Sequence, residues 1–422
     1  MKRTNSVYRH VFSQLRVRQN AQGALVSCYT TTPVFDRLTD NPLPPRLRVH
    51  RLCLPHFRWG QDYAEYFDGL DVGKAKLLFD GLVEPQNRRK FEFLDRRAAC
   101  GKTYAYWVSS PAGRLATGPI PIRMRDPHIW WPHDVINARL MAMVTQYPKK
   151  VEALACGTTA GGRELTALLV GNPQQQIALL GAVHAGESGP ELLIPAVERL
   201  LEHEPELLEQ VGIALLPSVN ADERDRLAFG CPWYLRTNAN GVDINRNFDA
   251  GWETVDRNYG YISSDPDAMT WRGPAANSEP ETRAVVRFVE TIRPVAVFSY
   301  HSLACITGAT FLAPQSAKAD EPYLLQCGCL TDAYRGAFYP TTPAYGSMHC
   351  GTTCGSLPSY VYQRLHMPAF DVEWDGNPAF KNSHYDLTTP AMLADCRERH
   401  YQGLRAVLKL LAHEPTQPKG KI

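Results

Sequence analysis

Residues 176–187 read QIALLGAVHAGE, an apolar run that ends in a histidine and a glutamate. The first eight residues, Gln176 to Val183, are largely apolar and predict a strand buried on both faces, as in a parallel sheet. The run stops at His184, and Glu187 follows three residues later. Open α/β sheets bind their ligands outside the carboxyl ends of their strands, so this His–Glu pair marks a candidate binding site.

The chain on both sides of this stretch alternates strands with helices. A helix is expected over Leu192–Leu201, with Pro195 tolerable only near its first turn. Ser278 and Glu281 have the S-x-x-E spacing of a capping box, which predicts a helix running to about Arg293. Further apolar or periodic segments predict strands over 211–219, 294–300 and 369–372 and a packed helix near 404–411. The prediction is an α/β domain with a mixed, mostly parallel sheet and helices on both faces.

The residues before this domain do not alternate between strand-like and helix-like segments. Residues 1–40 suggest an irregular or edge-strand lead-in, and short strand-like runs with turn residues follow from about 45 to 125. The part that reads GKTYAYWVSSPAGRLATGPIPIRM loosely resembles the second half of a fibronectin type III domain. We therefore expect a small β-sandwich over residues 1–132 and the α/β domain over residues 133–422.

Composition restricts the class of protein. The 422 residues include 45 Lys and Arg against 43 Asp and Glu, a balance that argues against recognition of nucleic acid or membrane surfaces by bulk charge. No apolar run approaches the roughly 18 residues that would span a bilayer, and the N-terminus lacks the apolar core of a secretory signal. Eleven cysteines without such a signal favour reduced thiols, and we expect a cytoplasmic protein.

Two more polar groups stand where predicted strands end. His301 follows the strand at 294–300, and Glu373 follows the strand at 369–372, where Asp371 and Asp375 would share its face if the strand stayed extended. His184, Glu187 and His301 together supply two imidazoles and one carboxylate, a ligand set typical of catalytic zinc. The H-x-x-E spacing alone is common by chance, so the argument needs a further motif.

That motif is NGVDINRNFD at residues 240–249. With H-x-x-E, His301-Ser302 and Glu373 in the same order, it makes the chain resemble the zinc carboxypeptidase family. The resemblance implies one Zn²⁺ per chain held by His184, Glu187 and His301, with Asp243 accepting a hydrogen bond from the outer nitrogen of His184. It also implies that Asn245 and Arg246 clamp the terminal carboxylate of a peptide or acylated amino acid.

The same resemblance implies the catalytic groups. Glu373 would act as general acid/base toward a zinc-activated water, and Arg236 would polarise the scissile carbonyl. Two departures from the family stand out: Gly186 replaces an arginine found between the first two ligands, and the expected tyrosine falls at Cys350. We take Tyr345 as the substitute for that tyrosine. Leu357 falls near the base of the specificity pocket, which would favour an apolar terminal side chain.

Three functions stay open at this point. The first is a zinc carboxypeptidase that hydrolyses the C-terminal peptide bond. The second is an N-acyl-amino-acid deacylase or cell-wall-peptide amidase on the same scaffold. The third is a non-catalytic binding protein, against which the retention of all three ligands and Glu373 counts. The run Cys350-Gly-Thr-Thr-Cys354 could suggest a second metal site, but no spacing matches a zinc ribbon, and ordinary thiols are the simpler interpretation.

Overall fold

A computed structural model describes residues 13–30, 43–55, 69–84, 90–111, 116–187, 189–233, 235–254, 262–301, 310–338, 348–373 and 390–413. The chain divides into two compact units. One comprises Lys2–Trp130 together with Arg226–Trp233, and the other comprises Trp131–Asp225 and Tyr234–Ile422. The sequence-based division placed everything after residue 132 in one domain, so the two descriptions differ at residues 131–132 and in the short segment Arg226–Trp233.

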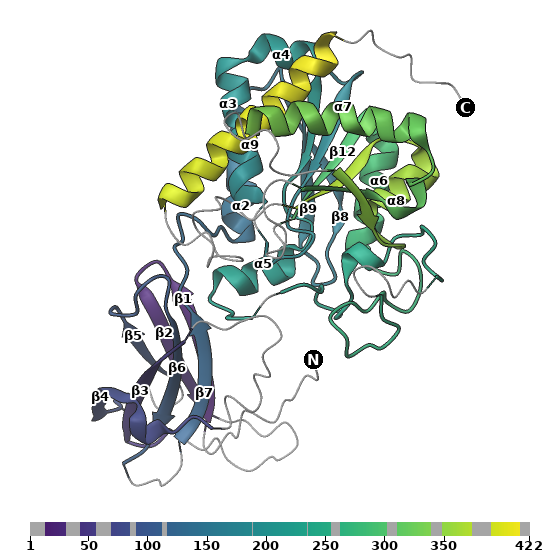
Figure 1. The fold of residues 1–422 in the computed structure, drawn as a ribbon. Helices are drawn as coiled ribbons and strands as arrows, with labels where there is room; N and C mark the ends of the chain where they lie inside the picture. The colour runs from purple at the N-terminus through teal and green to yellow at the C-terminus, as the bar shows by residue number, and fades with distance from the viewer. Residues whose placement is uncertain are drawn as a thin grey trace. The chain divides into compact units, whose positions relative to one another are not determined.

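The first unit is built from two antiparallel sheets that share one apolar core (Figure 1). The three-stranded sheet has the order β1 (Ser13–Asn20), β2 (Gly23–Thr30), β5 (Lys90–Asp95). The four-stranded sheet has the order β4 (Lys76–Leu82), β3 (Arg46–Leu54), β6 (Thr103–Ser109), β7 (Ala116–Arg123). A single 3₁₀ turn, η2 (Val72–Lys74), precedes β4. The strand-like runs expected between 45 and 125 correspond to β3 to β7, and the lead-in contributes β1, an edge strand, together with its hairpin partner β2.

The segment Arg226–Trp233 contributes backbone hydrogen bonds to this first unit. The amide of Gln19 donates to the carbonyl of Phe229 at 2.8 Å, and the amide of Arg123 donates to the carbonyl of Gly230 at 2.8 Å. The Arg125 guanidinium also donates to the carbonyls of Leu227 and Cys231. These contacts account for the grouping of the segment with β1 and β7 although it lies far from them in sequence.

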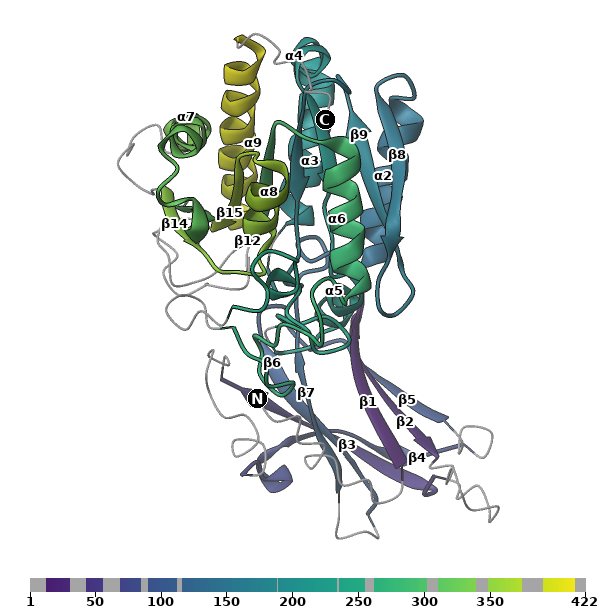
Figure 2. The same ribbon diagram turned by 90° about the vertical axis from the view of Figure 1, so that its right-hand side faces the viewer.

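The second unit contains one eight-stranded mixed sheet (Figures 1 and 2). Its order is β14 (Met348–Thr352), β13 (Thr310–Pro314), β15 (Ala369–Glu373), β12 (Ala296–His301), β10 (Gln176–Leu180), β11 (Gly212–Leu216), β9 (Glu164–Val170), β8 (Val151–Thr158). The four central strands β15, β12, β10 and β11 run parallel, and β13 and β9 join them antiparallel on either side. This is the α/β architecture expected from the apolar strands.

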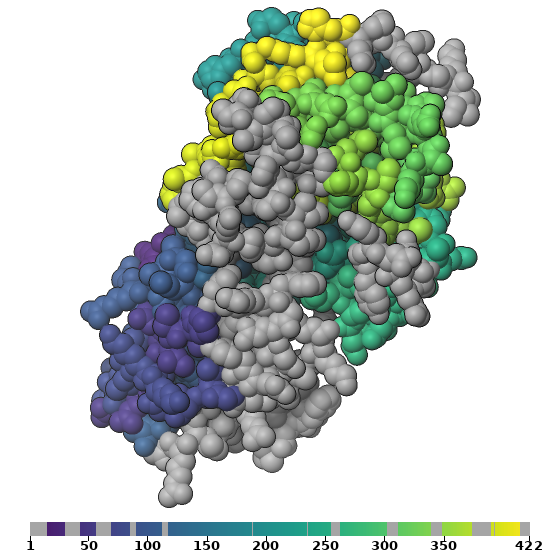
Figure 3. Space-filling model, viewed as in Figure 1, coloured from purple at the N-terminus to yellow at the C-terminus, as the bar shows by residue number. Residues whose placement is uncertain are grey.

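Helices cover both faces of this sheet. One face packs against α2 (His133–Gln146), α3 (Pro190–His203), α4 (Pro205–Gln210), α7 (Glu321–Phe338) and α9 (Pro390–His413). The opposite face packs against α6 (Pro280–Ile292) and α8 (Leu357–Leu365). Figure 3 shows α7 and α9 side by side on the outside of the first face. The remaining helical elements are α5 (Ala221–Ala228) and the 3₁₀ turns η4 (Ile244–Arg246) and η5 (Gln315–Ala317).

Two local predictions were wrong. Helix α6 begins after Glu279 without a side-chain cap, because Ser278 Oγ donates to the Glu279 carboxylate and Glu281 accepts from the amide of Ala160 instead. Pro195 lies inside α3 rather than in its first turn. The carbonyl of Glu191, which a proline at position 195 leaves without its helical partner, accepts from Arg397 Nε at 2.8 Å. A side chain from α9 thus makes Pro195 compatible with the helix.

Among the described helices, none is long and apolar enough to span a bilayer. None of the ten cysteines in the described ranges forms a disulfide.

Candidate metal centre

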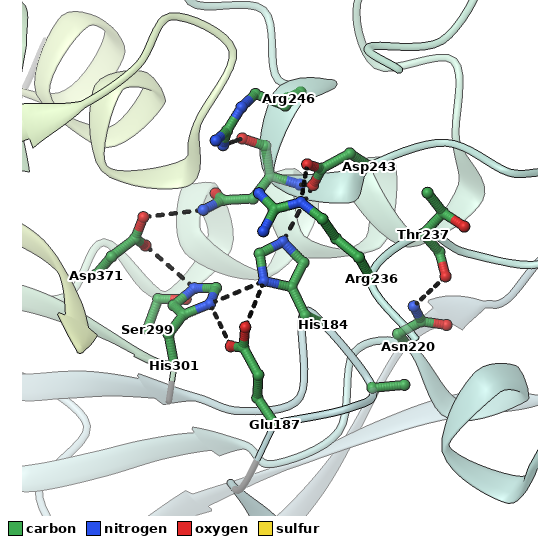
Figure 4. Close-up of polar contacts among 12 residues, drawn as sticks. His184, Glu187, Asn220, Arg236, Thr237, Asp243, Arg246, Ser299, His301 and Asp371 are labelled. Carbon is green, nitrogen blue, oxygen red and sulfur yellow. Dashed lines mark hydrogen bonds and ion pairs between the residues drawn. The ribbon is translucent and has the colours of Figure 1, made fainter. Parts of the chain in front are cut away.

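Three side chains converge at the carboxyl ends of β10 and β12. His184 and Glu187 lie in the turn after β10, and His301 is the last residue of β12. The carboxylate oxygens of Glu187 lie 3.1 Å from His184 Nδ1 and 2.8 Å from His301 Nδ1, and the two Nδ1 atoms are 3.2 Å apart (Figure 4). All three side chains are buried. Within the described chain, this is the one group of three or more His, Cys, Asp or Glu residues arranged to share an ion.

The arrangement fits zinc. With Zn–N bonds of about 2.05 Å, two ligands of a tetrahedral ion lie about 3.3 Å apart, close to the separations found here. Charge gives a second test, because four carboxylates (Glu187, Asp243, Asp371 and Glu373) face two guanidinium groups (Arg236 and Arg246) in this buried region. The surplus of two negative charges matches a dication with neutral imidazoles. The zinc ligands that the sequence predicted therefore meet in space.

The turn that carries the first two ligands is tightly held. Ala182 adopts a left-handed φ of 47°, and a Cβ at Gly189 would lie 2.8 Å from its amide, so the start of α3 can approach the end of β10 only with glycine there. Arg224 of α5 is fully buried and donates to the carbonyls of Ala185 and Glu187 at 3.2 and 2.9 Å. Its guanidinium also forms an ion pair with buried Glu191.

Asp243 lies behind His184. Its Oδ1 is 3.1 Å from His184 Nε2, and its Oδ2 accepts from Arg236 Nε at 2.7 Å. Burial opposes ionisation of this carboxyl, but the charges of Arg236 and Arg246 outweigh burial and hold the pKa of Asp243 well below its usual range. An ionised carboxylate at the outer nitrogen keeps the proton on Nε2 and turns the Nδ1 lone pair toward the ion.

The other predicted site residues surround the three ligands. Glu373 ends β15 in register with His301 on β12 and is buried. Arg246 is buried among Asp243, Asp371 and Glu373, and burial, the largest influence, lowers the pKa of its guanidinium. Asn245 Nδ2 donates to Asp371 at 2.9 Å, and its Oδ1 accepts from the amide of Leu357 at 3.0 Å. Tyr345 and Asp375 lie outside the described residues.

Sequence reasoning missed three residues of this region. Asp371 was left undecided against Glu373, although the two-residue alternation of a strand already placed both on one face. Arg224 and Glu191 gave no signal, because a charged segment such as ADERDRLA reads as a solvent-exposed helix. The second metal site considered around Cys350 and Cys354 does not form among the described residues.

Comparison with known proteins gives a consistent result. The family model described as zinc carboxypeptidase matches residues 136–380. Murein peptide amidase A of Escherichia coli K12 is 43% identical over 81 residues, which cover 18% of this chain and 34% of that protein. Human carboxypeptidase B is 28% identical over 174 residues, which cover 37% of this chain and 40% of that protein. The chain thus aligns with well under half the length of these two curated relatives.

The structure of carboxypeptidase A from Helicoverpa armigera aligns with a TM-score of 0.57 and 18% identity over 68% of this chain and 75% of that one. At such low identity the likeness concerns the fold alone. The family model, in contrast, matches more than half of the chain, and the chain belongs to the zinc carboxypeptidase family. The cofactor of this family is zinc, and the His–Glu–His cluster of this chain is the group that would hold it.

Proposed function

We propose that this protein removes C-terminal residues from peptides, with Glu373 as the general acid/base. One observation carries the proposal: Glu373 is paired with the ligand His301 on the neighbouring strand and interacts electrostatically with the buried Arg246. A proton acceptor, a metal site and a cation able to hold an anionic chain end thus lie near one another at this end of the sheet. Bound zinc would supply a polarised water at neutral pH.

Each residue has a distinct proposed task. Glu373 accepts the proton of the attacking water and returns it to the leaving amine, a role worth about 10²–10⁴ in rate. Arg246 binds the terminal carboxylate of the peptide, since a planar guanidinium can donate two parallel hydrogen bonds to it. Asn245 was expected to share this clamp; its side-chain contacts to Asp371 and Leu357 leave Arg246 as the principal anchor in our proposal. Arg236, beside Asp243, is the candidate for stabilising charge on the scissile carbonyl oxygen.

Two measurements on the full chain test this proposal. In Glu373→Gln, zinc content should stay at one equivalent while kcat falls by about 10²-fold or more, because the amide cannot accept the proton. A panel of matched peptides with free and amidated C-termini should show cleavage of the free acids alone. Arg246→Ala should impair cleavage of free-acid peptides and hardly change the low rate on amidated ones. Equal cleavage of both kinds by the unchanged protein would show that no terminal carboxylate is recognised.

Amidase activity on cell-wall peptides is the second candidate. The 43% identity over 81 residues with murein peptide amidase A favours it. Such a substrate also presents an amide bond to the same ligands and to Glu373, so the site alone does not separate the two reactions. A second arm of the substrate panel, containing branched cell-wall peptides, would decide between them by the bond that is cleaved.

A cytoplasmic location and the absence of a nucleic-acid partner stay predictions from composition, whereas the peptide substrate is an inference from the family. Fractionation of cells that produce the protein would test the first of these.

A further inference from the structure

The two zinc-binding imidazoles are supported in the same way from behind. His184 Nε2 lies 3.1 Å from Asp243 Oδ1, and His301 Nε2 lies 3.3 Å from Asp371 Oδ1 (Figure 4). Asp371 is 4% exposed and is therefore as well shielded from water as the ligands. The family resemblance assigns a task to Asp243, whereas nothing in that resemblance assigns one to Asp371.

A single residue connects these two carboxylates. The backbone amide of Asn245 donates to Asp243 Oδ1 at 3.1 Å, and its side-chain Nδ2 donates to Asp371 Oδ2 at 2.9 Å. The amide of Leu357, at the start of α8, fixes the other end of the Asn245 side chain at 3.0 Å. Polar contacts thus connect His184 with His301: hydrogen bonds link His184, Asp243, Asn245 and Asp371, and an ion-pair contact of 3.3 Å links Asp371 to His301.

Strand pairing explains why Asp371 reaches His301. In the parallel pair β12–β15, Ser299 is opposite Asp371 and His301 is opposite Glu373. Because side chains alternate along a strand, all four residues point to the same face of the sheet. Because Asp371 precedes Glu373 by two residues, its side chain lies on the same face of β15 and reaches His301 Nε2 on β12.

We propose that Asp371 is a positioning residue for the zinc ligand His301 and that Asn245 ties it to Asp243, so that both imidazoles are oriented by one connected set of polar contacts. Asp371 accepts the proton on His301 Nε2, which leaves the Nδ1 lone pair directed at the ion. This extends the zinc site of the proposed function and makes no assumption about which peptide is cleaved. Carboxylates that orient zinc-binding histidines typically change metal affinity or activity by 10–100-fold when they are replaced.

Ser299 is the competing partner of His301. Its Oγ lies 3.0 Å from the same Nε2 atom. A neutral hydroxyl stabilises the imidazole less than a charged carboxylate does, because charge-assisted hydrogen bonds are roughly twice as strong. Substituting each partner separately distinguishes the two.

The experiment measures zinc affinity of the full-length chain by competition with a chelator, without any substrate. Asp371→Asn should weaken zinc binding by about 10–100-fold, and Asn245→Ala, which leaves the Asp371 carboxylate in place, should weaken it in the same direction. Ser299→Ala should change affinity by less than about threefold. Asp95→Asn removes another buried carboxylate, paired with Arg51 and Tyr106 in the other unit, and should leave zinc affinity unchanged.

A cobalt-substituted sample gives a second readout that loss of stability alone would not move. The visible absorption of bound Co²⁺ should shift in Asp371→Asn and not in Asp95→Asn. Zinc affinity within twofold of the unchanged protein in both Asp371→Asn and Asn245→Ala would overturn the proposal, as would a larger loss in Ser299→Ala. If Asp371→Asn does not fold, the zinc affinity of Asn245→Ala alone tests the proposal. Failure to cleave any peptide, with zinc affinities as expected, would refute the proposed function and leave this inference standing.

Discussion

Replacing Arg224 with methionine should strongly destabilise the metal-binding turn, although Arg224 is not one of the predicted zinc ligands. Arg224 is fully buried, forms an ion pair with buried Glu191, and donates to the carbonyls of Ala185 and Glu187 on either side of Gly186. Methionine fills a similar volume but leaves the Glu191 carboxylate without its countercharge. Breaking a buried pair in this way costs about 3–5 kcal/mol, which is a large part of the ~5–15 kcal/mol that stabilises a typical domain.

The double variant Arg224→Met with Glu191→Gln separates charge from packing. It removes both charges, while the side-chain oxygen of glutamine can still accept the hydrogen bond that the Gly189 amide donates to Glu191 Oε2 at 3.3 Å. Because no unpaired charge stays buried, we expect the double variant to regain part of the about 3–5 kcal/mol that Arg224→Met loses.

Denaturant unfolding of the metal-free chain measures these free energies, and chelator-induced zinc release measures the effect on the turn. Arg139→Met is the matched control, because the Arg139–Glu198 pair has side chains that are 37% and 33% exposed and should contribute less than about 1 kcal/mol. A loss below 1 kcal/mol in Arg224→Met, or a double variant less stable than Arg224→Met, would refute the reasoning.

Three further outcomes follow from the same structure. His301→Ala should leave well under one equivalent of zinc after metal-replete purification, measured by elemental analysis. Burial lowers the pKa of His400 to about 3 from its usual 6.5, so between these pH values the unfolded chain binds a proton that the folded chain does not. The free energy of unfolding should therefore fall by up to about 1.4 kcal/mol for each pH unit below 6.5. The variant His400→Gln should show a smaller dependence on pH. Expression of residues 133–422 alone removes the strands that bind Phe229 and Gly230, so trypsin should cleave after Arg226 faster than in the full chain; equal rates would contradict this.

The sequence was informative wherever function depends on a short motif at the end of an apolar strand. His184, Glu187 and Asp243 follow recognisable local patterns, and His301 could be added because the strand before it was clear. Asp371 could not be chosen over Asp375 or Glu373 in the same way. Its task depends on β15 pairing with β12 in a register that places Ser299 opposite it, and pairing between distant segments leaves no local signature.

Buried charges were missed for a related reason. A polar helix such as α5 is expected at the surface, and the fully buried Arg224 contradicts that expectation only because Glu191 and three backbone carbonyls surround it. Pro195 also depends on a residue that is distant in sequence. The sequence confined it to the first turn of a helix, but Arg397, which donates to the carbonyl that Pro195 leaves unpaired, comes from the last described helix and makes an interior position possible.

The segment Arg226–Trp233 shows why a single cut in the sequence describes this protein incompletely. It begins in the last turn of α5, which carries Arg224, and ends three residues before Arg236, which contacts Asp243, yet its backbone hydrogen bonds to Gln19 and Arg123 belong to the β-sandwich. Backbone amides and carbonyls of a buried segment need partners, and these partners are supplied by strands more than a hundred residues earlier. The chain on both sides of this segment leads directly to groups of the zinc site.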